Sequence, residues 1–388
     1  VAAAPALAQD APSPSPGHQA LRVCADAARE NALEGCEALK GLLEAQDVAI
    51  ECVVADGCLE AEGPLIKDEV DVIFDTDSGQ LYSLYEAFED VDHTLEVVVE
   101  EHEGDALGEP TEFTGYYPVA VVTAAWCEAN PDATFDMLQG MRSCHTGYQK
   151  TAGWRASVGT LIKEGFVPIE SSPDSTPADI HSFQEWIGSA CVPGVAAEAS
   201  DGAANPLCEN CAGTDADFCA LGDVEPYYNY PGALRCLVED AGDVAFIRQR
   251  TPPEYLNTGE ENSFDPSWNY VNGDSMDDYK LLCLEGGCQP LSAFTQCSFP
   301  KTFGHTVVAS SDSEEVQALR TALNELSASS SEFQETFLSG GSLQGALFTD
   351  GATYLQAVEE TVEEFAGDMF ASWEEIDQLV SGEESSDK

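Results

Sequence analysis

The chain has 388 residues, of which 43% are hydrophobic, so it is long enough for two domains with cores of their own, and global disorder is excluded. Fifteen Lys and Arg side chains face 71 Asp and Glu side chains, a formal net charge of −56 that excludes nucleic acids and anionic membranes as partners. Such a charge opposes compaction unless salt screens it, so the sequence indicates an acidic, halotolerant protein.

Residues 1–20 have the pattern of a signal-peptide remnant followed by a flexible leader. Ala6, Leu7 and Ala8 fit an A-x-A cleavage site, and residues 11–17 are rich in Pro and Ser. No apolar run approaches the length of a membrane span, so no transmembrane segment is predicted. The 14 Cys favour disulfides and an extracellular location, or the outer face of the plasma membrane, reached by the secretory pathway.

Strand-like and helical patterns alternate in the first part of the chain. Apolar patterning predicts strands over 21–26, 48–55, 70–75 and 94–101, with helices over 28–46 and 78–89. This alternation is typical of an α/β domain with a mostly parallel sheet.

The rest of the chain continues the pattern and then becomes helical. Strands are expected over 116–126, 243–249, 279–285 and 304–310, around a loop-rich, Cys-dense stretch over 191–219. Helices are expected after Ser310, over 313–328, 332–339, 353–367 and 369–380. The order indicates one domain interrupted by another, with two crossing strands as a hinge and a ligand cleft between the domains.

The stretch SCHTGYQKTAGW, which begins at Ser143, combines a hydroxyl, a cation and glycines at an expected helix start. Thr146 and Lys150 can bind an anion there, and Gly153 lets the backbone approach closely. It is not a P-loop, because Gln149 instead of Gly precedes the lysine. The alternative is a plain helix cap.

The stretch DTDSGQLYSLYE, from Asp75 to Glu86, resembles a calcium loop but has Gln80 where the turn needs Gly. The alternatives are that Asp77 caps a helix, or that it is a metal-binding carboxylate at the end of a strand.

The CENC stretch from Cys208 to Cys211 has no strand and helix around it, so structural disulfides are favoured over a redox or zinc site. No metalloprotease or nucleophile-elbow motif is present.

Tyrosines cluster at two places, Tyr116 with Tyr117, and Tyr227 with Tyr228 and Tyr230. They are either core residues with bonded hydroxyls or phenolate ligands of a highly charged cation. Hard oxygen ligands with one imidazole suit ferric iron better than zinc or copper.

These segments together resemble the transferrin family. The anion motif, the two tyrosine segments YYPVAVV and YPGALRCL, and the segments AGDVAFIRQ, DYKLLCLEGG and GHTVVA occur in family order. The similarity runs from about Leu21 to about Tyr354 and corresponds to one lobe. It implies an α/β fold of two domains like those of periplasmic binding proteins, with mixed sheets hinged around a central cleft.

The resemblance also implies the bound species and their ligands. One Fe³⁺ is expected on Asp77, Tyr116, Tyr230 and His305, with Asp75 as a rival for Asp77. Carbonate (bicarbonate) is expected at the side chains of Thr146 and Lys150 and the amides near Ala152 and Gly153.

Two positions depart from the family pattern. Lys150 stands where Arg is usual and cannot form a bidentate fork, so weaker anion binding is expected. Arg248 and Thr349 occupy the positions of an acid-sensitive lysine pair, so acid release is expected to depend on the ligands alone.

The resemblance implies six disulfides and a division of the chain into domains. The pairs are Cys24–Cys58, Cys36–Cys52, Cys144–Cys236, Cys191–Cys211, Cys208–Cys219 and Cys283–Cys297, with Cys127 and Cys288 left over. Domain 1 is expected over 21–113 and 306–382, domain 2 over 114–305, and an acidic tail over 383–388.

The expected function is extracellular binding and transport of ferric iron with carbonate, with release on acidification. This leaves room for a cell-surface uptake receptor. The alternatives are a homologue that binds no iron and acts as a binding or inhibitory protein, and an enzyme, which no nucleophile motif supports.

Overall fold

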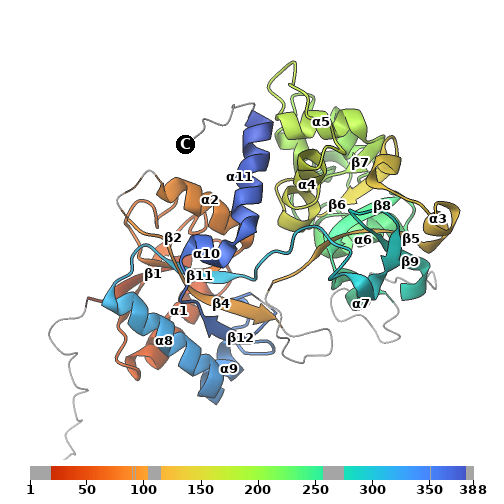
Figure 1. Cartoon of the computed structure of the whole chain (residues 1–388). Helices are drawn as coiled ribbons and strands as arrows, with labels where there is room; N and C mark the ends of the chain where they lie inside the picture. Colours follow the sequence, from red (N-terminus) through yellow and green to blue (C-terminus); the bar gives the residue numbers. More distant parts are fainter. Residues whose placement is uncertain are drawn as a thin grey trace, which may run out of the picture. The chain divides into compact units, whose positions relative to one another are not determined.

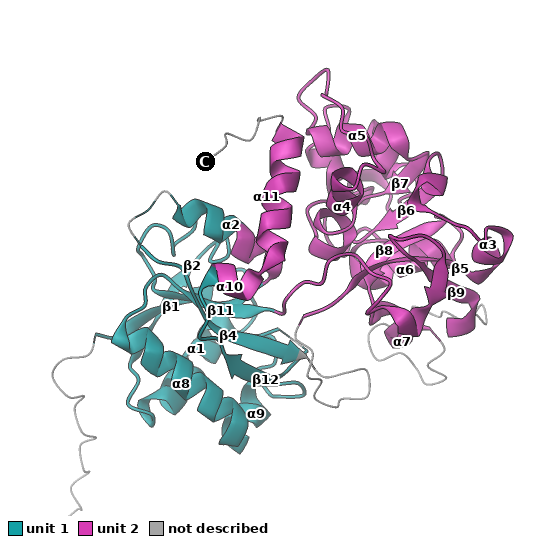
Figure 2. Ribbon diagram, in the orientation of Figure 1, with its two compact units in different colours: residues 1–76, 83–102, 305–362 teal, residues 77–82, 103–304, 363–388 magenta. Residues whose placement is uncertain are grey.

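The computed structural model describes residues 19–89, 91, 93–103, 115–256, 275–349 and 351–381. It divides the chain into two compact units, coloured in Figure 2. Unit 1 comprises residues 1–76, 83–102 and 305–362, and unit 2 comprises residues 77–82, 103–304 and 363–388. The expected signal remnant, leader and acidic tail lie outside the described residues.

Unit 1 is built on a six-stranded mixed sheet in the order β12-β4-β11-β3-β1-β2 (Figure 1). Its strands are β1 (Leu21–Asp26), β2 (Ile50–Ala55), β3 (Val72–Thr76), β4 (Glu96–Glu103), β11 (Thr306–Ala309) and β12 (Ala352–Ala357). Strand β1 pairs in parallel with β2 and β3, whereas β11 is antiparallel to β3 and β4.

The helices of unit 1 bury one apolar face each. They are α1 (Ala32–Glu44), α8 (Glu314–Ser329) and α9 (Ser331–Phe337), and α2 (Ser78–Phe88) has its last turns here. In α1, Leu39 and Leu43 are one turn apart and fully buried in the core of this unit. The hydroxyl of Ser313 accepts the Val316 amide and caps α8.

Unit 2 has a second six-stranded mixed sheet, in the order β10-β9-β5-β8-β6-β7. Its strands are β5 (Pro118–Thr123), β6 (Arg142–His145), β7 (Ser189–Cys191), β8 (Val244–Arg248), β9 (Tyr279–Leu282) and β10 (Cys288–Pro290). Strand β6 is parallel to β7 and β8, and β5 is antiparallel to β8 and β9. The expected α/β class with mixed sheets is confirmed, but neither sheet is mostly parallel.

The remaining helices are α3 (Ala124–Ala129), α4 (Val158–Lys163), α5 (Ala178–Trp186), α6 (Asn229–Val238), α7 (Thr251–Tyr255), α10 (Val362–Ala366) and α11 (Asp368–Ser381). A π-helical turn, η2 (Thr151–Arg155), precedes α4. Short 3₁₀ turns are η1 (Phe135–Leu138), η3 (Val195–Ala197), η4 (Gly202–Ala204), η5 (Pro206–Cys208), η6 (Asp215–Asp217), η7 (Met276–Asp278) and η8 (Leu291–Ala293).

Helix α11 packs within unit 2. The ring of Trp373 meets that of Tyr82 edge to face at 5.4 Å, and Ile376 fills the space beside Gly159, where a Cβ would come within 2.9 Å of it. The compact units therefore place residues 77–82 together with 363–381, whereas the sequence-based division assigns both of these stretches to domain 1.

Two predicted elements were wrong. Residues 353–367 were expected to form a helix, but β12 occupies their first part and α10 their last. The Thr353 and Tyr354 side chains suit a strand at the edge of the sheet, and this tertiary setting outweighs local helical periodicity. The strand expected over 116–126 ends at Thr123, whose hydroxyl accepts the Trp126 amide and starts α3.

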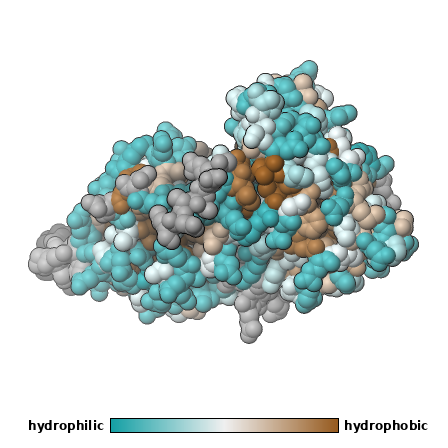
Figure 3. Space-filling model, turned by 45° about the horizontal axis from the view of Figure 1, so that its top comes forward, coloured by the Kyte–Doolittle hydropathy of each residue, from teal (hydrophilic) through white to brown (hydrophobic). Residues whose placement is uncertain are grey.

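Hydrophilic residues dominate the face of the molecule in Figure 3, where hydrophobic residues gather in a few patches. This agrees with the excess of acidic side chains in the sequence. Within the described ranges, every helix is either too short or too polar to cross a bilayer.

Candidate functional site

Two tyrosines of unit 2 lie side by side. Tyr116 stands just before β5, fixed by reciprocal backbone hydrogen bonds with Thr302 of 3.1 and 3.0 Å. Gly115 permits this approach, because its φ is +76° and a Cβ there would lie 1.8 Å from the Thr302 carbonyl oxygen. Tyr230 is in the first turn of α6, and the two ring centroids are 6.1 Å apart.

Both phenols of this pair resist ionisation. Burial raises the pKa of Tyr116, although hydrogen bonds to Tyr230 and Thr151 oppose the shift. Burial also raises the pKa of Tyr230 well above its usual value, and the neighbouring phenol adds to the effect. These groups are therefore neutral at physiological pH, and each would give up its proton only to a strongly charged cation.

Asp77 lies next to the two phenols and immediately precedes α2. Its Oδ1 accepts the Gln80 amide at 2.9 Å, and its own amide donates to Gln80 Oε1 at 2.9 Å, a reciprocal helix cap. Its negative charge also raises the pKa of both Tyr116 and Tyr230. Unit 2 thus brings three of the expected metal ligands close together.

The anion motif lies in the same unit, after β6. In the described part of the chain, Thr146 Oγ1 is buried and has no hydrogen-bond partner. A Cβ at Gly153 would lie 2.1 Å from that oxygen, so only Gly fits against the hydroxyl at this position. The backbone amide of Asn229 donates to the Thr146 carbonyl at 2.9 Å, which ties the motif to the start of α6 beside Tyr230.

A buried histidine, His145, forms a hydrogen bond with the backbone of the anion motif. His145 Nδ1 lies 2.7 Å from the Gly153 carbonyl, so this nitrogen donates, and Nε2 accepts from Ser143 Oγ at 2.8 Å. Burial lowers the pKa of His145 to about 4, so the ring stays neutral at physiological pH. His145 thereby fixes the position of Gly153.

Lys150 and the turn η2 complete the motif. Lys150 is half-buried, in extended conformation just before η2, and its Nζ lies 5.8 Å from the centre of the Tyr228 ring. The first amides of a helical segment, here those of Thr151, Ala152 and Gly153, have no intrahelical acceptor. A cation, a hydroxyl and these amides are the groups that a small oxyanion requires.

A charged cluster in unit 1 contains His305, the remaining expected metal ligand. His305 Nδ1 lies 2.5 Å from Asp75 Oδ1, and Asp75 Oδ2 is ion-paired with Arg29 Nη2. Burial opposes ionisation of Asp75, but its interactions with His305 and Arg29 prevail and lower its pKa. Burial, reinforced by the charge of Asp75, raises the pKa of nearby Glu101 to about 8.

Comparison with known proteins shows which protein family the chain resembles. Residues 21–375 match the protein family described as Transferrin. The chain is 30% identical over 375 residues to serotransferrin of Xenopus tropicalis, an alignment that covers 96% of this chain and 46% of that protein. The chain belongs to the transferrin family.

Two other relatives are similar to this chain at comparable levels of identity, and each alignment again covers less than half of the relative. Transferrin of Blaberus discoidalis is 30% identical over 362 residues, which cover 88% of this chain and 46% of that protein. Human lactotransferrin is 35% identical over 243 residues, which cover 62% of this chain and 30% of that protein. This transferrin-family chain therefore spans less than half the length of the curated relatives it matches.

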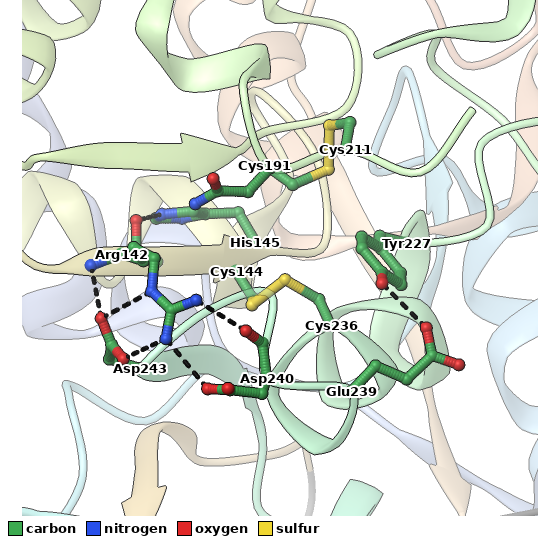
Figure 4. The surroundings of a disulfide bond; sticks show 12 residues. Arg142, Cys144, His145, Cys191, Cys211, Tyr227, Cys236, Glu239, Asp240 and Asp243 are labelled. Carbon is green, nitrogen blue, oxygen red and sulfur yellow. Dashed lines mark hydrogen bonds and ion pairs between the residues drawn. A yellow bond between two sulfur atoms is a disulfide. The ribbon is translucent and has the colours of Figure 1, made fainter. Parts of the chain in front are cut away.

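All 14 cysteines of this transferrin-family chain are in disulfides. The six pairs that the resemblance implies are present, and Cys127–Cys288 is the seventh. Cys144–Cys236 joins the strand before Thr146 to α6, which carries Tyr230 (Figure 4). Figure 4 also shows Arg142, beside this bridge, paired with Asp240 and Asp243.

Other metal sites weighed from the sequence find no support. Among the described residues, the only cluster of at least three His, Cys, Asp or Glu ligands is Cys191, Cys211 and Glu225, and its two sulfurs form a disulfide. Cys208 of the CENC stretch is bridged to Cys219. The described part of the Asp75–Glu86 stretch contributes no such carboxylate cluster.

The two positions of the absent lysine pair have other partners. The Arg248 guanidinium lies 4.6 Å from the centre of the Tyr230 ring, and Nη2 is 3.5 Å from Glu254 Oε2. The Thr349 amide donates to Glu101 Oε2 at 2.7 Å in unit 1.

Sequence reasoning missed Arg29, Glu101 and His145. Arg29 is 46 residues from Asp75, and no local pattern announces their contact. Glu101 lies within a predicted strand. A carboxyl group at a buried position of a strand is unusual, and this is the signal that could have indicated a functional role for Glu101. His145 lies within the anion motif itself, but its sequence neighbours do not distinguish it from an ordinary core residue.

Proposed function

We propose that this chain binds one ferric ion together with carbonate and serves in extracellular iron capture and transport. The phenolates of Tyr116 and Tyr230, the Asp77 carboxylate and the His305 imidazole are the proposed protein ligands. Thr146, Lys150 and the amides of Ala152 and Gly153 are the proposed carbonate ligands. The pairing of Tyr116 with Tyr230, 6.1 Å between ring centroids, is the observation that carries the proposal.

The chemistry of the ligand set favours ferric iron. Two phenolates and one carboxylate balance the charge of Fe³⁺, and hard oxygen donors prefer such an ion over softer divalent metals. Because both phenols have raised pKa values, a weakly polarising cation would not displace their protons at neutral pH.

The residues of the anion motif fit a small planar dianion. The buried, unpartnered hydroxyl of Thr146 offers a hydrogen bond that no described protein group accepts. Lys150 supplies one positive charge, and the amides at the start of η2 supply partial charge and donors. Carbonate bound here would contribute oxygen ligands to the metal and hold part of its charge within the protein.

Acid reverses such binding by protonating the ligands. Carbonate, the imidazole of His305 and the two phenolates all lose affinity for the metal once protonated. Release on acidification is therefore expected without a separate lysine trigger. The complete set of seven disulfides supports an oxidising, extracellular setting for this function.

A ferric titration with and without bicarbonate tests the proposal. Purified protein should develop a visible phenolate-to-iron absorption band that saturates at one iron per chain, and only when bicarbonate is present. A protein that stays colourless under both conditions would indicate the alternative, a family member that binds no iron. Esterase and CO₂-hydration assays on the same sample test the enzymatic alternative.

A further inference from the structure

Asp75 makes two contacts that together fix it in unit 1. Its Oδ1 lies 2.5 Å from His305 Nδ1, and its Oδ2 is paired with Arg29 Nη2. The side chain is only 14% exposed, so these contacts are largely shielded from water. Both carboxylate oxygens are therefore already engaged by protein groups.

Arg29 is itself held in place by the backbone. Its Nε donates to the Gly345 carbonyl at 2.6 Å, and Nη2 also reaches the Phe348 carbonyl at 3.3 Å. A guanidinium held by two carbonyls presents its remaining donors in a fixed direction. Arg29 thus fixes Asp75, and Asp75 in turn contacts the imidazole.

The backbone at Asp75 is adapted to this contact. Its φ of +57° is in the left-handed region, which Asp and Asn adopt far more readily than other side chains with a Cβ. This turn at the end of β3 separates Asp75 from Asp77, whose own carboxylate caps α2 and lies near the phenols. The two acids, two residues apart, consequently have different surroundings.

We propose that Asp75, anchored by Arg29, is the positioning residue of His305 and is not a metal ligand. This rests on the proposed function. A carboxylate that accepts a hydrogen bond from Nδ1–H fixes the tautomer whose lone pair is on Nε2. It also makes Nε2 more basic and therefore a stronger ligand for a metal ion. The rivalry between Asp75 and Asp77 for the metal is then resolved in favour of Asp77.

The test uses three variants. Asp75→Ala removes the acceptor, and Asp75→Asn removes the charge while it tolerates the left-handed backbone. Asp71→Asn is the matched control, because Asp71 forms a comparable pair with Arg22 in the same unit, 2.6 Å between Arg22 Nη2 and Asp71 Oδ1.

The first measurement is the nitrogen NMR spectrum of His305 in metal-free protein at a pH where the ring is neutral. Wild type and Asp71→Asn should show the proton on Nδ1, and Asp75→Ala should shift the population toward Nε2–H. A wild-type ring protonated on Nε2, or a tautomer that Asp75→Ala leaves unchanged, would overturn the proposal.

The second measurement is ferric affinity in bicarbonate. Asp75→Ala should weaken it about 10- to 100-fold, and Asp75→Asn by less, while the phenolate band keeps its position and Asp71→Asn binds like wild type. Equal affinity of Asp75→Ala and the control would refute the positioning role alone. Absence of iron binding in wild type would instead refute the proposed function and, with it, the role of Asp75.

Discussion

The rings of Tyr116 and Tyr230 meet edge to face in unit 2, with their planes at 77° and their centroids 6.1 Å apart. Tyr116 lies just before a strand and Tyr230 in the first turn of a helix, 114 residues later in the chain. Their phenols interact with each other and with Asp77, and removal from water keeps them protonated. Each phenol is therefore expected to lose a proton when a metal ion binds.

Ferric binding should become tighter as the pH rises. Because the pKa of each phenol is raised, each must lose a proton when the metal binds, so lower pH favours the metal-free protein. Tyr116→Phe or Tyr230→Phe should weaken the absorption band and reduce the slope of log affinity against pH by about one proton.

Tyr117→Phe is the control for this experiment. It changes the adjacent residue, whose ring packs against Phe294 with centroids 5.3 Å apart. Its band and pH slope should match those of wild type. A Tyr230→Phe protein with the full band and slope would show that this phenol is not a ligand.

Removing the hydroxyl of Thr146 should weaken the anion without weakening the fold. Since Thr146 Oγ1 has no partner among the described residues, Thr146→Val should leave the free energy of unfolding unchanged or slightly higher. Bicarbonate affinity, measured by titration in the presence of iron, should fall about 10- to 100-fold, the value of a hydrogen bond to a charged group.

Thr160→Val is the control, because it is expected to change stability and to leave anion binding unchanged. Its buried hydroxyl donates to the Ala156 carbonyl at 2.6 Å, so its loss should lower stability by about 1 kcal/mol and leave bicarbonate binding unchanged. If Thr146→Val is instead the destabilised variant and binds bicarbonate normally, the hydroxyl serves the fold alone.

Lys150→Arg should tighten anion binding. Lysine offers a point charge, whereas a guanidinium can donate two parallel hydrogen bonds to a planar oxyanion. We expect about a tenfold gain in bicarbonate affinity, measured by the same titration. Identical affinities of the two proteins would contradict the placement of the anion beside this residue.

Arg248 should influence release through Tyr230. If acid release depended on the ligands alone, as the sequence predicts, substitution of Arg248 would leave the release pH unchanged. The guanidinium, however, lies 4.6 Å from the Tyr230 ring, and its charge lowers the pKa of that phenol. Without this charge the phenol holds its proton more tightly. Arg248→Met should therefore release iron at a higher pH, by about half a unit.

Arg250→Met controls for the loss of one positive charge. Arg250 pairs with the same Glu254 through Nε, 3.1 Å from Oε1. Its release pH, followed by decay of the phenolate band during acidification, should stay near that of wild type. A shift of equal size in both variants would point to general electrostatics in place of the ring contact.

The sequence predicts the fold class and the elements of the site, but it does not predict the contacts between distant residues. Alternating patterns are sufficient for the α/β class, and motif order is sufficient to single out Tyr116 and Tyr230. The apolar spacing from Thr353 onward fits both a helix and an edge strand, and only pairing in the sheet decides between them. The Arg29–Asp75 contact depends on how the turn that carries Arg29 packs against β3, which carries Asp75, and local patterns do not encode this.

The most direct test of the central claim is the stoichiometry of iron and labelled carbonate retained after gel filtration. The account predicts one ferric ion and one carbonate per chain, with loss of either one causing loss of the other. Thr146→Val should lose both together. Iron retained in full by protein prepared without carbonate, or iron bound with no labelled carbonate, would contradict the claim that the metal and the anion bind as a unit.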